Sequence, residues 1–211
     1  MDVFEIVKQV ESERNSLSEL LPSYFREDFI KESFVSGGCI YSYHHDQEPK
    51  DIDVFIRSED LVDELSDYFN RQRVFKKRSN VRVGKYRDHN LVLTDNAISI
   101  RKYQIITRWT GEPEKIVSQF DFKHNMFWVQ DGRFYSLVDF SYLEGDKVRY
   151  NEQRARDICG TIMRIPKFIK KGMKVPKEEI AKMLLKLNEV GFNDRELEIL
   201  IDSNADKSFG S

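Results

Sequence analysis

The stretch Phe34–Ile56 constrains the fold and the chemistry of this 211-residue chain more than any other part of it. A short apolar run leads into the glycine pair Gly37-Gly38, and after an excursion a predicted strand carries Asp51 and Asp53. Because side chains alternate along a strand, the two carboxylates share one face, with α-carbons roughly 7 Å apart. Ile52, Val54 and Ile56 share the other face, and Phe55 falls on the face of the aspartates.

Two carboxylates on one strand face repel each other by about 2 kcal/mol at an effective dielectric near 20. A cation bound between them would relieve that repulsion. Paired oxygen ligands on a strand suit Mg²⁺, which takes one or two carboxylates together with substrate phosphates. A phosphate-handling metal site is therefore the first hypothesis.

The composition is that of a globular chain with its own core, since 40% of the residues are hydrophobic, including 15 Phe and 9 Tyr. A net charge of -2 excludes a globally basic nucleic-acid binder but allows a local basic patch. No apolar run reaches the length of about 18 residues that suggests a membrane span, and the acidic N-terminus is unlike a signal peptide. Cys39 and Cys159 are expected to be buried small side chains in a reducing, cytoplasmic setting with no membrane partner.

Hydrophobic periodicity and turn residues predict an α/β arrangement up to about residue 140. The expected elements are helices over 2–20 and 25–33, a helix capped by Ser58, strands within 73–107, a short helix at Pro113, a strand over 120–129 and a hairpin turn at Asp131-Gly132.

Beyond about residue 140 the pattern becomes helical. The expected helices cover Asn151–Met163 and Lys167–Lys171, begin at Pro176, and begin again with a capping residue at Asn193. The fold class is therefore a mixed α/β sheet with flanking helices, followed by a small all-helical part. The predicted domains are 1–145 and 146–211.

The glycine pair and the two aspartates together resemble the signature of the DNA polymerase β-like nucleotidyltransferase superfamily. Its members carry Gly-Gly or Gly-Ser on a strand–helix turn and then Asp-x-Asp on the next strand. Here Gly37-Gly38 and Asp51-Ile52-Asp53 are separated by twelve residues. The match is locally closest to the CCA-adding enzyme and poly(A) polymerase branch, which has Arg-Asp where this chain has Tyr41-Ser42.

The segment 163–173 loosely resembles the first neck helix of those enzymes, with Arg164, Lys167 and Phe168 at matching positions. The resemblance implies a nucleotidyltransferase-like fold and a metal-dependent reaction. In that reaction a nucleoside monophosphate moves from an NTP to an acceptor hydroxyl on RNA, protein or a small molecule, and pyrophosphate is released.

The resemblance also implies which residues act. Asp51 and Asp53 would bind Mg²⁺ or Mn²⁺, and a third carboxylate on a later neighbouring strand would join them at a second ion. Asp121 is the preferred third ligand, because it is expected to begin a strand after a short helix, and Asp139 is the alternative. Nucleotide contacts are expected from Ser36, Gly37, Gly38, Lys50, Arg164 and Lys167.

Other polar groups have weaker interpretations. His44, His45 and Asp46 lack the Cys/His partners of a zinc site and are expected in a polar loop over the site. His124 is expected to be packed or hydrogen-bonded.

Two basic clusters could steer a triphosphate or an RNA backbone, or could be solvated faces. In the first, Phe75 and Tyr86 could add base stacking. The clusters are Arg71, Arg73, Lys76, Lys77, Arg78, Arg82, Lys85 and Arg87, and then Arg164, Lys167, Lys170, Lys171 and Lys174.

Two other functions remain open at this point. One is a catalytically degenerate member of the superfamily that binds nucleotide or a partner. The other is a toxin–antitoxin component that acts on tRNA or a partner protein.

Overall fold

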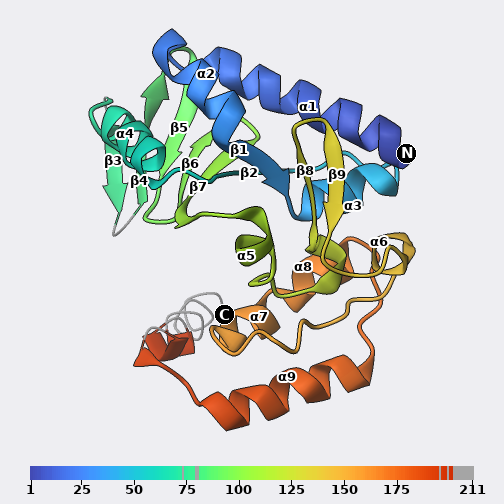
Figure 1. The fold of residues 1–211 in the computed structure, drawn as a ribbon. Coiled ribbons are helices and arrows are strands. Elements are labelled where there is room, and N and C mark those ends of the chain that lie inside the picture. Colours follow the sequence, from blue (N-terminus) through green and yellow to red (C-terminus); the bar gives the residue numbers. More distant parts are fainter. Residues whose placement is uncertain (73, 79–80, 195, 199, 202–211) are drawn as a thin grey trace. The chain divides into compact units, whose positions relative to one another are not determined.

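The computed structural model describes residues 1–72, 74–78, 81–194, 196–198 and 200–201, and for 74–78 only the backbone. In these residues one mixed sheet has the order β3-β4-β5-β6-β7-β2-β1-β8-β9 (Figure 1). The strands are β1 (Ser33–Ser36), β2 (Ile52–Ile56), β3 (Val74–Arg78), β4 (Val81–Tyr86), β5 (His89–Leu93), β6 (Ala97–Ile100), β7 (Tyr103–Thr110), β8 (Phe127–Gln130) and β9 (Arg133–Ser136).

Helices flank this sheet and dominate the C-terminal part, which confirms the predicted fold class. The helices are α1 (Val3–Leu20), α2 (Ser23–Glu32), α3 (Gly38–His44), α4 (Glu59–Asn70), α5 (Pro113–Val117), the 3-10 turn η1 (Lys123–Asn125), α6 (Ser141–Glu144), α7 (Ile158–Met163), α8 (Ile165–Lys170) and α9 (Lys177–Val190). No described helix is both long and apolar enough to cross a membrane.

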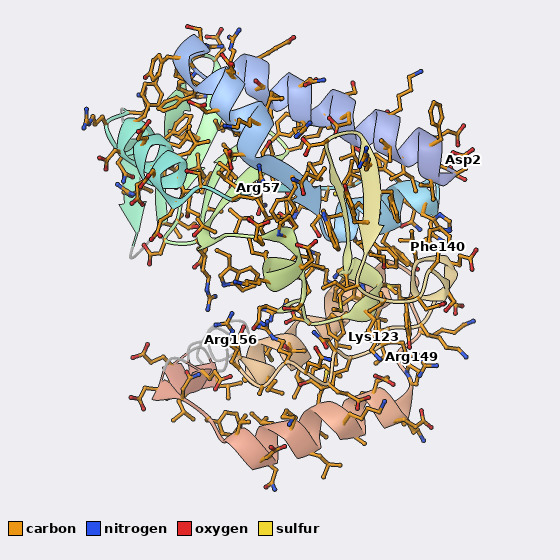
Figure 2. All side chains as sticks on the ribbon, viewed as in Figure 1. Asp2, Arg57, Lys123, Phe140, Arg149 and Arg156 are labelled. Atoms are coloured by element: carbon orange, nitrogen blue, oxygen red, sulfur yellow. The ribbon has the colours of Figure 1, made fainter. Side chains whose placement is uncertain are left out.

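Local capping explains where the two longest N-terminal helices begin. Asp2 accepts a hydrogen bond from the Glu5 amide (2.8 Å), and Glu5 accepts one from the Asp2 amide (3.0 Å), so α1 starts with a capping box (Figure 2). The Ser58 hydroxyl accepts from the Leu61 amide (3.2 Å) at the start of α4, as predicted. Asn193 and Glu196 cap each other in the same reciprocal way at the expected last helix.

Strand β2 lies inside the sheet, between β1 and β7. Its pairing with β7 is parallel, and every other neighbouring pair among the described strands is antiparallel. Directly after β2 ends at Ile56, the guanidinium of Arg57 (labelled in Figure 2) pairs with Glu32 (3.4 Å) at the end of α2. Three of its apolar side chains are almost fully buried: Ile52, Val54 and Ile56.

Two predicted elements were wrong in extent. The segment before β8 is not a strand, because Phe122 makes an isolated bridge with Tyr150 and η1 follows before β8 begins at Phe127. The expected helix from Asn151 starts only at Ile158, because Asp157 takes a left-handed conformation (φ 53°) just before it.

The described chain divides into two units. Unit 1 comprises Met1–Ser118 with His124–Glu144 and holds the whole sheet. Unit 2 comprises Gln119–Lys123 with the described residues from Gly145 onward. The five residues 119–123 are therefore built into the helical unit, although both sequence neighbours belong to the sheet unit.

Candidate functional site

The glycine pair and the two aspartates lie at one end of the neighbouring strands β1 and β2, which is called the sheet edge below. Strand β1 ends at Ser36, directly before Gly37, and the antiparallel strand β2 begins at Ile52, between Asp51 and Asp53. The end of one antiparallel strand lies beside the start of its neighbour, so the two motifs meet although twelve residues separate them. The sequence-based expectation of a strand–helix turn followed by a second strand is confirmed.

Gly37 makes the turn from β1 into α3. Its φ of 95° and ψ of -151° are a conformation that glycine adopts readily and other residues rarely do. Gly38 then begins α3. A backbone without a β-carbon at this turn lets a ligand approach its amide groups closely.

Asp53 lies on the face of the sheet opposite the buried side chains of Ile52, Val54 and Ile56. Both Asp51 and Asp53 are partly exposed, whereas Ile52 and Val54 are buried. The helix-covered face is identified by Tyr103, which pairs with Ile52 and whose hydroxyl reaches α1. Asp53 therefore lies on the other face, as predicted from alternation, whereas Asp51, which was predicted on the strand, directly precedes β2.

The negative charge of Asp53 affects the pKa of the nearby Cys39 thiol. Burial raises the pKa of Cys39 to about 12, and the nearby negative charge of Asp53 adds to this rise. The thiol donates to the Ser36 carbonyl (3.9 Å) and is 2% exposed. Cys39 and Cys159 are both free and buried, which confirms their predicted role as small core side chains.

The remaining expected nucleotide contacts of unit 1 differ in availability. The Ser36 hydroxyl is fully buried and donates to the Phe127 carbonyl (2.7 Å), so it is engaged within the sheet. Lys50 is exposed one residue before Asp51. The Ser42 hydroxyl, where the resembling branch has an aspartate, donates back to the Gly38 carbonyl (2.9 Å) inside α3.

The histidines near the site are packed rather than arranged as metal ligands. His44 ends α3 and His45 caps it, so the polar loop expected there is largely helical. His45 Nε2 lies 2.8 Å from the Leu143 carbonyl, and the Tyr41 ring packs against both His45 and the buried His124. Among the described residues no group of three His, Cys, Asp or Glu side chains could hold a metal ion.

Asp121 belongs to unit 2 and does not begin a strand, which corrects the reason for preferring it as third ligand. Its Oδ1 lies 2.8 Å from Nε of Arg154 and accepts from the Thr161 hydroxyl (3.0 Å). Its Oδ2 pairs with Nε of Arg164. Both carboxylate oxygens are therefore neutralised inside unit 2.

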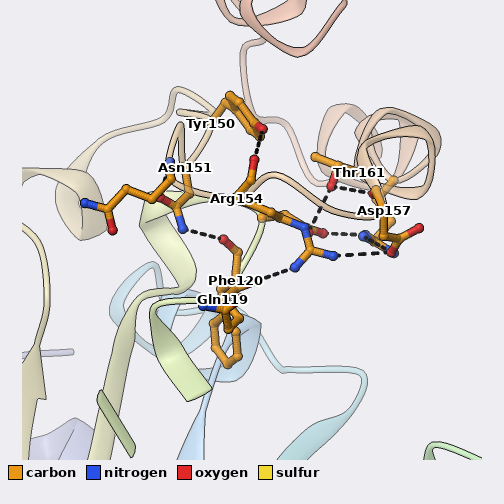
Figure 3. Close-up of polar contacts among 10 residues, drawn as sticks. Gln119, Phe120, Tyr150, Asn151, Arg154, Asp157 and Thr161 are labelled. Atoms are coloured by element: carbon orange, nitrogen blue, oxygen red, sulfur yellow. Dashed lines mark hydrogen bonds and ion pairs between the residues drawn. The ribbon is translucent and has the colours of Figure 1, made fainter. Parts of the chain in front are cut away.

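Arg154, Asp157 and Thr161, all labelled in Figure 3, belong to a polar network that includes Asp121. Arg154 is 4% exposed and also contacts Asp157 (3.3 Å) and the Gln119 carbonyl. Burial lowers the pKa of Arg154, an effect that Asp121 opposes. Burial acts the same way on Arg164, but there the charges of Asp121 and Asp157 prevail and raise the pKa.

The other candidates outside the sheet edge have plain surroundings. Asp139 is exposed, and hydrogen bonds from the Ser141 hydroxyl and from the Ser141 amide (2.9 Å) lower its pKa. Lys167 is exposed on α8. Asp139 as a metal ligand and Lys167 as a nucleotide contact both stay predictions.

The first basic cluster is partly outside the described side chains, which exclude Phe75 and the basic residues Arg73, Lys76, Lys77 and Arg78. Tyr86 is 4% exposed and its hydroxyl donates to the Leu20 carbonyl (2.9 Å), so its ring is not available for base stacking. Arg82 bonds the Asn70 side chain.

Sequence reasoning missed Gln104. On β7 it is the partner of Asp53 in the parallel ladder, so its side chain lies beside Asp53 on the same face. Like Asp53 it is partly exposed. The signal was the alternation in Tyr103–Ile106, but the pairing of β7 with β2 rather than with a later strand could not be read from one sequence.

A cavity of about 270 Å³ lies elsewhere in unit 1. Its lining includes Val62 of α4, Ile98 and Thr107. Because Ile98 pairs with Ile105 and Ile105 with Val54, the cavity is on the face opposite Asp53. It is therefore separate from the carboxylate edge.

One family of known proteins matches this chain. The model of a family described as "Gabija anti-defense 2 family protein" matches residues 11–142, more than half of the chain. No curated protein matches this chain.

Solved structures of CCA-adding enzymes have the same fold. The Thermotoga maritima CCA-adding enzyme complexed with tRNA is 13% identical with a TM-score of 0.54, over 90% of this chain and 46% of that one. A CCA-adding enzyme with CTP is 15% identical with a TM-score of 0.52, over 87% and 45%. This chain thus spans less than half the length of either enzyme. At these identities the likeness shows the nucleotidyltransferase fold alone.

Proposed function

We propose that this chain, which belongs to the Gabija anti-defense 2 family, is a metal-dependent nucleotidyltransferase that moves a nucleoside monophosphate from an NTP to an acceptor hydroxyl. One observation carries this proposal. Asp53 of β2 and Asp51 directly before this strand are both partly exposed, next to the Gly37-Gly38 turn. The nucleotidyltransferase fold supports it but does not by itself establish an activity.

The donor set at this edge fits Mg²⁺ or Mn²⁺. Two partly exposed carboxylates, two residues apart in the sequence, supply hard oxygen ligands, and their mutual repulsion favours a cation between them. When bound, such a cation neutralises triphosphate charge and polarises oxygens of the reacting groups.

The chain's own residues would mainly position the substrate, since phosphoryl transfer depends chiefly on positioning and charge neutralisation. Asp51 and Asp53 hold the metal–triphosphate complex against the sheet. The Gly37-Gly38 turn lets backbone amides approach phosphate oxygens, and exposed Lys50 adds a positive charge next to Asp51. Arg164 and Lys167 of unit 2 stay candidates for further nucleotide contacts.

The acceptor class is open among RNA, protein and small molecules. The two CCA-adding enzymes were solved with tRNA and with CTP, which makes an NTP and an RNA the first substrates to try. The family description adds a biological setting, in which the activity would counteract the defence that the family is named for.

The activity is tested by incubating the purified chain with Mg²⁺ or Mn²⁺, each α-labelled NTP in turn, and total RNA or cell lysate. We expect label to move to a macromolecule or small acceptor, and Asp51→Asn and Asp53→Asn to abolish the transfer. Asp67→Asn, an exposed aspartate on α4, is the matched control and should keep it. Transfer that survives in Asp53→Asn would contradict the proposal.

A second candidate function is a binding module that retains a metal–nucleotide complex without transferring it. The neutral Gln104 beside Asp53 favours this candidate. It predicts Asp53-dependent nucleotide binding with no labelled product from any NTP or acceptor fraction.

A cellular test addresses the biological setting. The chain is co-expressed with a functional Gabija defence, and the protection that this defence gives is measured. Wild-type chain should reduce protection, and Asp53→Asn should restore it at equal expression. Equal reduction by both would separate the anti-defence role from the carboxylate site.

A further inference from the structure

We infer that Gln104 is the third side chain of the carboxylate site, and that its neutral amide leaves the site with one firm and one weak divalent-cation position. Because it deepens the proposed function, this inference rests on Asp51 and Asp53 holding a cation. It adds a prediction about how many cations the site holds and how tightly.

The parallel β2–β7 ladder places Gln104 there. Asp53 pairs with Gln104, and Gln104 pairs in turn with Ser99 of β6, so the three side chains form a row across one face. Neighbouring strands lie about 4.8 Å apart, which brings the Gln104 amide within reach of a ligand held by Asp53. All three side chains are partly exposed, whereas Val54 and Ile105 on the other face are buried.

The start of β7 is fixed by bonds on both of its sides. The Ile52 amide donates to the Lys102 carbonyl (2.8 Å), which ties the residue between the two aspartates to β7. The Tyr103 hydroxyl and the Lys102 ammonium both bond Glu13 of α1, at 2.8 Å each. Gln104 therefore directly follows two residues, Lys102 and Tyr103, whose positions are fixed by hydrogen bonds, and its own position beside Asp53 is fixed with them.

The charges of Asp51, Asp53 and Gln104 explain why one cation should bind more firmly than the other. An amide oxygen is an acceptable ligand for a hard divalent cation but carries no charge. Two carboxylates balance one such cation, and a second one would be held by the nucleotide phosphates and a neutral amide. No described residues form a group of three carboxylate, imidazole or thiol ligands that would supply the missing charge. Asp121, the third ligand preferred from the sequence, is neutralised by two arginines.

The test is a Mn²⁺ titration followed by electron paramagnetic resonance, with the full chain and a non-hydrolysable ATP or CTP analogue. Wild type should bind one Mn²⁺ firmly and a second about tenfold more weakly or worse. Gln104→Glu adds the missing charge and should tighten the second by about tenfold or more. Gln104→Leu should weaken it further. The control is Ser99→Ala, one strand further from Asp53, which should match wild type.

The outcomes separate this inference from the proposed function. If Asp53-dependent Mn²⁺ binding is present but Gln104→Glu matches wild type, Gln104 is not at the site and the inference is overturned. Two equally tight Mn²⁺ ions in wild type also overturn it. If wild type binds no more Mn²⁺ than Asp53→Asn does, the proposed function itself fails. Circular dichroism melting of each variant verifies that it is folded.

Discussion

Gly160 lies where a side chain would collide with a charged neighbour. A Cβ at this position would lie 2.4 Å from Oδ1 of Asp157. That carboxylate has little freedom to move, because its other oxygen pairs with Arg154 (3.3 Å) and Arg164 (3.2 Å). We predict that Gly160→Ala lowers the free energy of unfolding by about 1–3 kcal/mol, measured by urea denaturation.

The cause can be isolated with a double-mutant cycle. In an Asp157→Ala background the colliding carboxylate is absent, so Gly160→Ala should cost much less there. An equal cost in both backgrounds would mean that the collision is not the cause.

At the scale of elements, one buried carboxylate joins α1, α3 and β7. Glu13, 8% exposed, accepts from Lys102 (2.8 Å), Tyr103 (2.8 Å) and Tyr43 (3.3 Å). We predict that Glu13→Gln lowers the free energy of unfolding by about 2–3 kcal/mol at pH 7, because charge-assisted bonds are lost. Glu19→Gln, an exposed change on the same helix, should be neutral in the same denaturant titration.

The same carboxylate predicts a pH dependence. Burial raises the pKa of Glu13, but hydrogen bonds from Lys102 and Tyr103 outweigh it, so the pKa is lowered from 4.5. Its contribution to stability is therefore complete above pH 4.5 and disappears as the pH falls through the lowered pKa. Glu13→Gln should flatten this part of a curve of unfolding free energy against pH. A wild-type curve that the variant reproduces in the acid range would contradict the assignment.

Local patterns predicted most elements, whereas pairing between distant segments could not be predicted. The positions of Gly37 and Asp53 follow from short-range alternation and turn chemistry, and the structure has them where they were expected, although β2 begins at Ile52, one residue after Asp51. Gln104 was missed because strand partnership is a long-range property. Asp121 was wrongly predicted on a strand. A short apolar, aromatic sequence does not distinguish a segment that packs in a sheet from one that, as here, packs among helices.

At the scale of the whole molecule, Asp121 joins segments that are distant in sequence. It neutralises Arg154, which is 4% exposed, and Arg164. We predict that Asp121→Asn lowers the free energy of unfolding by about 3 kcal/mol, because the buried Arg154 guanidinium loses the nearer of its two carboxylate partners. Affinity for Mn²⁺ should remain that of wild type.

The two readouts distinguish a structural role from a ligand role. Thermal melting should report the loss of stability, and a Mn²⁺ titration should leave the site of Asp51 and Asp53 unchanged. Asp67→Asn, an exposed change on α4, should alter neither. A drop in Mn²⁺ affinity as large as that of Asp53→Asn would make Asp121 a metal ligand after all.

The parallel pairing of β2 with β7 has a consequence for synthesis of the chain. Between these partners come α4 and the antiparallel strands β3 to β6, so β2 waits for about fifty residues before its second neighbour exists. Until Tyr103–Thr110 leaves the ribosome, β2 has an unpaired edge with two aspartates at its start. Those charges discourage pairing with a foreign strand, so the residues proposed to bind a cation in the finished protein would also protect the nascent one from aggregation.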